Sequence, residues 1–257
     1  MDPALACMLS FGLYCSVSAV DASVRTDASA SAGTSGTVES AVTDGQPDGV
    51  ASPESHTPPT GSASEVLAKV QKFYDATNDL RAHFRQTYVH PVYGTTSVMT
   101  GTVKIKKPGK MVWDYEKQSE PDFFADENTL WMVERETKQV VTTDVRKSDF
   151  SSAIKFLFGG QQLVRDFKVR HAPQELVTRY GMPGHHAVEL KPKETSAHYK
   201  RLVLIVDAQS GRVDAFVVRN GDDSTNHFVL SDFAVNSALP EGDFTFRVPK
   251  GYTVNKE

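Results

Sequence analysis

Apolar and polar residues alternate along residues 99–115, as they do in β-strands with one buried face. A period of two places the apolar members on one side of a sheet. Lys107-Pro108-Gly109 interrupts the alternation, and its proline and glycine favour a turn between two strands. The apolar positions of this predicted hairpin are Met99, Val103, Ile105, Met111, Trp113 and Tyr115.

Two more short strands are expected directly after this hairpin. A break from Lys117 to Pro121 leads into residues 123–125, and Asp126-Glu127-Asn128 turns the chain into residues 130–133. These strands add Phe124, Leu130 and Met132 to the apolar face, and Phe84 adds to it from an earlier strand. A Met-rich and aromatic face suggests a site for an apolar ligand, but spacing alone favours an ordinary sheet core.

A helix is predicted just before the first strand. Ser62 and Glu65 have the spacing of a capping box, which marks a helix start. The helix is expected to end near Asn78-Asp79. Its apolar stripe would consist of Val66, Val70, Phe73, Thr77 and Leu80. In the strand that follows, Ala82, Phe84 and Gln86 alternate with polar residues.

The second half of the chain also has the pattern of short strands. Turns recur every 8–12 residues, which indicates a barrel or a sandwich. Residues 202–206 are apolar on both faces and are predicted to form a central strand. The other expected strands are residues 138–143, 167–171, 176–180, 186–190, 213–218, 228–233 and 244–248.

One further helix is predicted within residues 150–158. Ser148-Asp149 supplies an N-cap, and Gly159-Gly160 ends the helix. Four large apolar residues share one helical face: Phe150, Ile154, Leu157 and Phe158.

The first 63 residues have a different composition. Residues 1–22 contain a short apolar run that ends in small residues, which is typical of a signal peptide, although Met1-Asp2-Pro3 carries no positive charge. An alternative is a lipid anchor on Cys15, but Tyr14 fits poorly before it. Residues 23–63 are rich in Ser, Ala, Gly and Pro and predict a disordered tether. The folded domain is then 64–257.

Charge and motifs exclude several classes of function. Of the 28 bases and 32 acids, residues 62–257 hold 27 and 25, a net charge near +2 that argues against nucleic acid as a partner. Both cysteines, Cys7 and Cys15, precede the domain, which therefore has no disulfide and no thiolate metal site. No catalytic motif is present, so no catalytic residue and no cofactor are expected.

Histidines and paired acids give no stronger indication of chemistry. His185-His186 follows Pro183-Gly184 and is expected in a turn, and neighbouring strand residues face opposite ways, so they are not expected to share a metal. Asp222-Asp223 is expected in a hairpin loop.

Several short motifs, in their order and spacing, resemble the LolA family of periplasmic carriers of outer-membrane lipoproteins. The resemblance covers roughly residues 64–257. Its motifs are F-x-Q (Phe84, Gln86), KKPGKMVWDY (106–115), DENTLW (126–131), VDAQSGRV (206–213) and FTFRVPKGYTV (244–254).

The resemblance implies a mainly β fold with lid helices (α+β), an incomplete antiparallel β-barrel around a hydrophobic cavity. Residues 150–158 would form a lid. The residues expected to line the cavity are Phe84, Met99, Val103, Ile105, Met111, Trp113, Tyr115, Phe124, Leu130, Met132, Phe150, Ile154, Leu157 and Phe158. Lys107 stands where the family usually has an arginine that holds the closed form, and lysine lacks the planar fork of that arginine. Lys107 is therefore the candidate lid latch.

The resemblance also implies a function. A periplasmic monomer would accept acylated lipoproteins from an inner-membrane ABC-type releasing complex and deliver them to an outer-membrane acceptor. Two alternatives stay open: a lipid-sensing regulatory module with the same open barrel, and a membrane-anchored acceptor resembling LolB.

Overall fold

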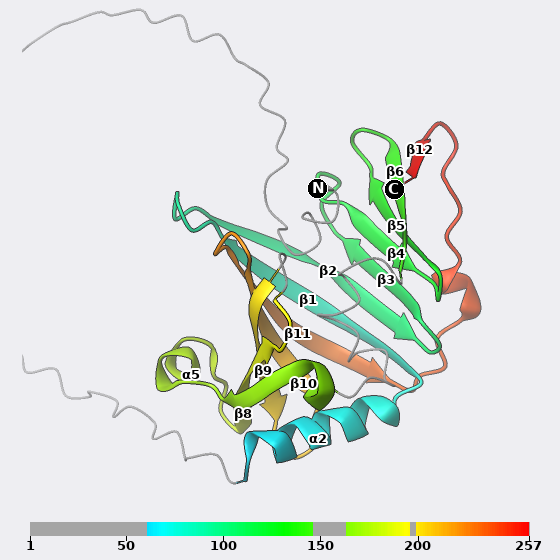
Figure 1. Cartoon of the computed structure of the whole chain (residues 1–257). Coiled ribbons are helices and arrows are strands. Elements are labelled where there is room, and N and C mark those ends of the chain that lie inside the picture. Colours follow the sequence, from blue (N-terminus) through cyan, green and yellow to red (C-terminus); the bar gives the residue numbers. More distant parts are fainter. Residues whose placement is uncertain (1–60, 146–162, 196–198, 257) are drawn as a thin grey trace, which may run out of the picture. The chain divides into compact units, whose positions relative to one another are not determined.

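A computed structural model describes residues 61–145, 163–195 and 199–256 of the chain. The predicted signal peptide, nearly all of the predicted tether and the predicted helix at 150–158 lie outside these residues. All described residues belong to one compact unit, and their strands form a single twelve-stranded sheet (Figure 1). The fold is mainly β, as the sequence predicts.

The first half of the sheet is a meander of antiparallel strands, each paired with the next in the chain. Its strands are β1 (Asp79–Val89), β2 (Thr96–Lys106), β3 (Lys110–Tyr115), β4 (Asp122–Ala125), β5 (Thr129–Glu134) and β6 (Gln139–Asp144). The hairpin predicted around Pro108 is therefore confirmed as β2 and β3.

The second half is another antiparallel meander. Its strands are β7 (Phe167–His171), β8 (His185–Pro192), β9 (Tyr199–Asp207), β10 (Val213–Asn220) and β11 (Thr225–Val235). β9 has neighbours on both sides, and its residues 202–206 are all buried, which confirms the predicted central strand. The two meanders join where β1 pairs antiparallel with β11.

The N-terminal helix α2 (Ala63–Asp75) begins where the sequence predicts. The Ser62 hydroxyl accepts a hydrogen bond from the Glu65 backbone N–H, and the Glu65 side chain accepts one from the Ser62 N–H, so the capping box is formed. The helix stops at Asp75, a few residues before the predicted end, and Tyr74 rather than Phe73 is its buried aromatic residue.

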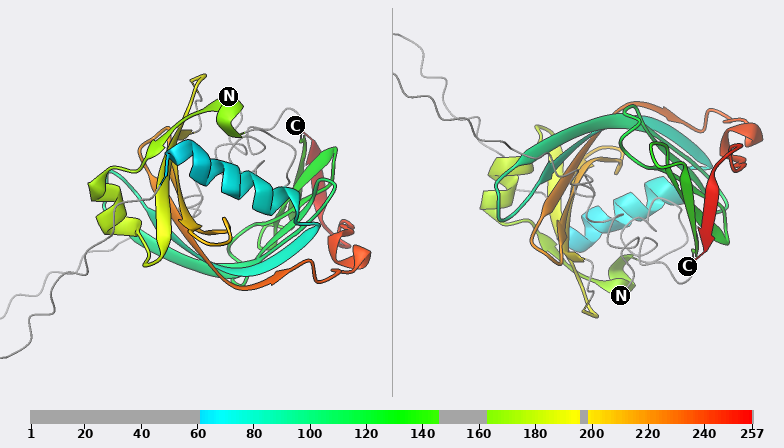
Figure 2. Two further views of the ribbon diagram at one scale, coloured as in Figure 1. Left: turned by 90° about the horizontal axis from the view of Figure 1, so that it is seen from below. Right: turned by 90° about the horizontal axis from the view of Figure 1, so that it is seen from above.

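The sheet curls strongly, and α2 runs across the open side of the curve (Figure 2). The helix contacts β7 and β8, together with the short helix α4 (Leu163–Asp166). The apolar residues on the inner face of both meanders and on α2 form one continuous hydrophobic core. The architecture is an incomplete barrel, because β7 and β12 (Thr253–Lys256) remain at the two edges of the sheet.

Residues 176–180 are helical, so the strand predicted there is wrong. They belong to α5 (Gln174–Tyr180), which starts after Pro173. Leu176 and Tyr180, four residues apart on one helical face, pack against the outer face of β9 and β10. In Figure 1 this helix lies outside the curve of the sheet.

Residues 244–248 are not a strand either. Phe244 ends a 3-10 turn, η2 (Glu241–Phe244), and the chain then runs along the outside of β4 and β5, where the Phe246 ring lies 4.7 Å from that of Phe124. The last strand, β12, comes later and pairs in parallel with β6. Pro249-Lys250-Gly251 separates this strand from residues 244–248, where the strand was predicted.

No helix among the described residues is long and apolar enough to cross a membrane.

Candidate functional site

Aromatic rings from both meanders meet on the inner face of the sheet. The Phe84 ring lies 4.9 Å from the rings of both Trp113 and Tyr115, measured between centroids. Trp113 in turn lies 5.4 Å from Phe228, which stacks on Phe216 at 4.6 Å. Two strands, β2 and β1, separate β3 from β11 in the sheet. In a flat sheet the Trp113 and Phe228 rings would be too far apart to touch, so they meet here because the sheet is curved. We call these five residues the aromatic cluster.

Most of the apolar residues singled out in the sequence belong to this cluster or to the hydrophobic core around it. All of them are less than a tenth exposed and belong to the same hydrophobic core. This group consists of Phe84, Met99, Val103, Ile105, Met111, Trp113, Tyr115, Leu130 and Met132. The predicted shared face is confirmed, and the lining of a lipid site by these residues stays a prediction.

Phe124 does not lie on this face, and its assignment to the inner lining is wrong. In the register of the sheet it stands opposite Val112 and Trp131, and its ring packs on Phe246 outside the curve. Its neighbour Phe123 pairs with Trp113 and Met132 and takes the inner position. With two adjacent phenylalanines, the sequence alone does not show which one faces inward. The pairing register of β4 with its neighbours decides this.

The remaining candidates for the cavity lining belong to the predicted lid and lie outside the described residues. They are Phe150, Ile154, Leu157 and Phe158.

A chain of buried polar side chains crosses the inner face beside the aromatic cluster. The Tyr115 hydroxyl donates to Gln86 Oε1 at 2.6 Å, and the Gln86 amide donates to Asn226 Oδ1 at 2.7 Å. Gln86 and Asn226 are at most 1% exposed. Gln86 was predicted as part of the first strand and of a family motif, without a role in the site, and Asn226 was not predicted. The available signal was a glutamine at an apolar position of the alternation through Ala82 and Phe84.

Lys107 is bonded to the C-terminal end of α2. Its Nζ donates to the backbone carbonyls of Tyr74 at 2.5 Å and Asp75 at 3.1 Å, and its own N–H donates to the Asn78 carbonyl at 2.9 Å. The last carbonyls of a helix have no partner within the helix and carry partial negative charge, so a lysine there is favourable. Lys107 therefore ties the β2–β3 turn to α2. Its role as a lid latch stays a prediction.

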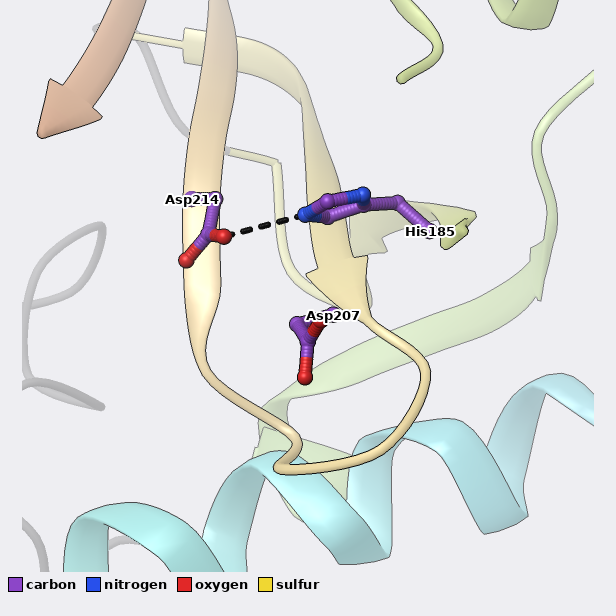
Figure 3. A group of neighbouring side chains, drawn as sticks. All are labelled: His185, Asp207 and Asp214. Carbon is purple, nitrogen blue, oxygen red and sulfur yellow. Dashed lines mark hydrogen bonds and ion pairs between the residues drawn. The ribbon is translucent and has the colours of Figure 1, made fainter. Parts of the chain in front are cut away.

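A histidine and two aspartates meet beside the β9–β10 turn, whose Ala208 carbonyl accepts a hydrogen bond from Lys69 of α2. Atoms of His185, Asp207 and Asp214 that are able to bind a metal lie within 4.8 Å of one another (Figure 3). His185 opens β8 instead of lying in the expected turn, and its Nε2 lies 3.0 Å from Asp214. Asp214 already receives two hydrogen bonds from the Arg212 guanidinium, at 2.5 and 2.9 Å.

These contacts determine the charge of the cluster. Burial opposes ionisation of Asp214, but hydrogen bonds from Arg212 and His185 outweigh it and hold the pKa of this carboxyl below its usual value. The Asp207 carboxylate accepts hydrogen bonds from the Ser210 hydroxyl and N–H, which lower its pKa as well. A metal ion would have to displace the Arg212 guanidinium, so the cluster is best described as an ion-pair network that closes the β9–β10 turn.

Comparison with known proteins identifies the family. A family profile described as outer membrane lipoprotein carrier protein LolA matches residues 75–247. The chain belongs to the LolA family.

Individual relatives carry the same description. The outer-membrane lipoprotein carrier protein of Cupriavidus pinatubonensis is 29% identical over 205 residues, which cover 77% of this chain and 91% of the relative. That of Cupriavidus taiwanensis is 29% identical over 195 residues, covering 74% and 87%. Among solved structures, a LolA superfamily protein from Nitrosomonas europaea is 12% identical with a TM-score of 0.42, covering 73% of this chain and 99% of that one.

Proposed function

We propose that the protein is a periplasmic carrier that binds the acyl chains of lipoproteins on the inner face of its curved sheet. It receives them from an inner-membrane ABC-type releasing complex and delivers them to an outer-membrane acceptor. The observation that carries this proposal is the aromatic cluster, because it joins apolar side chains of both meanders on one concave face. Membership of the LolA family and the names of the relatives support it.

Physical chemistry explains why such a carrier is needed. Each CH₂ group moved into water costs about 0.8 kcal/mol, so the acyl chains of one lipoprotein amount to some tens of kcal/mol. That penalty prevents a free lipoprotein from crossing an aqueous compartment. A carrier removes most of it by covering the chains with its own apolar side chains. Methionines such as Met99 and Met111 suit this task, since an unbranched thioether adapts to ligands of different shape.

The proposal requires no chemistry from the protein. Binding and release depend on the difference between apolar contacts in the loaded and the free protein, and no cofactor enters either step. A monomer is sufficient, because both halves of the aromatic cluster come from one chain.

The test is the identity of what the protein carries. The full chain is isolated from the periplasm and its bound molecules are identified by mass spectrometry. Acylated lipoprotein fragments are the expected result. Phospholipid alone would favour a lipid-sensing module, an acyl group on Cys15 would favour an anchored acceptor, and an empty protein would contradict the proposal.

Two neighbouring residues of β2 give a matched pair of variants for a loading assay. Met99 is 4% exposed on the inner face, whereas Val98 is 40% exposed on the other face of the same strand. Met99→Glu places a charge against the acyl chains and is expected to abolish loading, while Val98→Glu leaves loading unchanged. Circular dichroism checks that both variants are folded before loading is compared. Equal loading of a folded Met99→Glu variant would exclude this face from the binding site.

A further inference from the structure

Trp113 holds a buried hydrogen-bond donor that has no acceptor in the described part of the chain. The side chain is 5% exposed, and its indole Nε1 has no hydrogen-bond partner among the described residues. Buried donors in native proteins are nearly always paired, since an unpaired one has lost its hydrogen bonds to water and gained none. An exception within a candidate binding face therefore requires an explanation.

The surroundings of Trp113 are apolar. Its ring contacts those of Phe84 and Phe228, and its partners across the sheet are Val103 and Phe123. None of these four side chains has an oxygen. In contrast, the Tyr115 hydroxyl on the same strand finds its acceptor in Gln86. Within the described residues, Tyr115 of β3 therefore has an acceptor for its hydroxyl, whereas the indole N–H of Trp113 on the same strand has none.

We propose that the Trp113 N–H donates a hydrogen bond to the carbonyl oxygen that links an acyl chain to its carrier molecule, an ester or an amide. This inference rests on the proposed function, because it assumes that acyl chains occupy the inner face. Indole is a donor only and needs an acceptor. An acyl chain is hydrocarbon throughout except at the carbonyl at its head.

The chemistry of the site favours a neutral acceptor over a charged one. No cationic side chain contacts Trp113 in its ring contacts or strand pairs, so a phosphate or a free carboxylate would be buried there without a counter-charge. An ester or amide carbonyl brings an acceptor without that penalty. The hydrogen bond would also fix how deeply a chain enters, because the carbonyl has to stop at the indole while the methylene groups continue among the phenylalanines.

The inference predicts that the protein distinguishes acyl from alkyl lipids. A diacyl lipopeptide with ester links and its dialkyl analogue with ether links have the same chain length, but the analogue lacks the carbonyl. A neutral hydrogen bond of ordinary net strength makes the ester form bind about 2- to 10-fold more tightly. Both affinities are measured on the full chain by displacement of the methyl ester of a fluorescent fatty acid.

Two variants separate this role from general packing. Trp113→Phe is expected to bind both lipids with equal affinity. The chain has only one other tryptophan, Trp131, which packs on Phe246 outside the curve, so Trp131→Phe is the matched control and should keep the full ester preference. If Trp113→Phe does not fold, replacement of Trp113 by benzothienylalanine removes the N–H and preserves the shape of the ring.

A direct readout comes from the indole protons. With two tryptophans, the ¹⁵N-labelled protein gives two indole N–H signals, and the Trp131→Phe variant assigns them. The Trp113 proton should move downfield with the ester lipid and less with the ether lipid. Retention of the ester preference in Trp113→Phe, or equal binding of both lipids by the wild type, would overturn this inference alone. Failure of the wild type to bind either lipid would overturn the proposed function as well.

Discussion

The ring of Phe84 occupies the space that a side chain at Gly101 would fill. A Cβ atom on Gly101 would lie 2.5 Å from Phe84 Cζ and 2.1 Å from the backbone oxygen of Asp114. Both distances are far shorter than a real carbon atom tolerates. The missing side chain on β2 is what lets Phe84 from β1 reach Tyr115 on β3.

Gly101→Ala is therefore expected to lower the free energy of unfolding by about 2 kcal/mol or more, as overpacking in a tight core does. Because one of the two clashes involves backbone, shortening Phe84 in the same chain should not restore stability. Urea denaturation measures the effect. Gly242→Ala is the control, since nothing lies within 4 Å of a Cβ at that position, and a comparable loss in both variants would contradict the clash.

Replacing Lys107 tests its attachment to α2. Lys107→Met removes the two hydrogen bonds to the last carbonyls of the helix and is expected to lower stability by about 1–2 kcal/mol. Lys110→Met, which breaks an ion pair with the mostly exposed Glu241, should change stability far less than Lys107→Met does. Equal melting temperatures of the two variants would show that the hydrogen bonds from Lys107 to α2 do not contribute measurably to stability.

The helix cap of α2 offers a smaller effect with a close control. Ser62→Ala removes the oxygen that accepts from the Glu65 N–H, and the loss of an N-cap typically amounts to about 1 kcal/mol. Ser64→Ala, at an exposed position inside the same helix, should be neutral or slightly stabilising. Thermal unfolding of both variants decides whether the cap contributes to stability.

His227 is expected to make stability depend on pH. Burial and the nearby guanidinium groups of Arg85 and Arg179 lower the pKa of this histidine. Below its unfolded pKa of about 6.5, the unfolded chain takes up a proton that the folded protein resists. Stability from this group is therefore present above that pH and is lost as the pH falls toward 5.

Urea denaturation from pH 5 to 8 tests this expectation. Relative to His227→Gln, the wild type should lose stability as the solution is acidified, whereas His83→Gln, at an exposed position of β1, should follow the wild type. A constant difference between the wild type and His227→Gln across this range would show that the histidine does not sense pH.

The sequence predicted those elements whose pattern has only one reading. Met99, Val103 and Ile105 alternate strictly, and a one-residue slip would turn all of them outward, so the hairpin of β2 and β3 is fixed by its side chains. The capping box at Ser62 is similarly local. The strand prediction for residues 176–180 was wrong because Leu176, Val177 and Tyr180 fit a strand as well as a seven-residue helix. Only contact with the outer face of the sheet decides between the two.

The features of the site that the sequence did not predict all depend on contacts between strands. Whether Phe123 or Phe124 points inward depends on the pairing of β4 with its neighbours. Asn226 meets Gln86 because β11 lies beside β1, a contact 140 residues apart in the chain. The indole N–H of Trp113 has no acceptor among the described residues, and a missing acceptor leaves no signal in a sequence.

The pairing of β1 with β11 has a consequence for how the protein is made. The first and the eleventh strand of the chain hold the two meanders together, and the aromatic cluster draws Phe84 from one meander and Phe228 from the other. Contacts between such distant parts of a chain form slowly during folding. Until the seam closes, each meander exposes its own share of the rings to water and to other chains, which is the condition that favours aggregation. The newly made chain therefore depends on protection from aggregation until its own two meanders have paired.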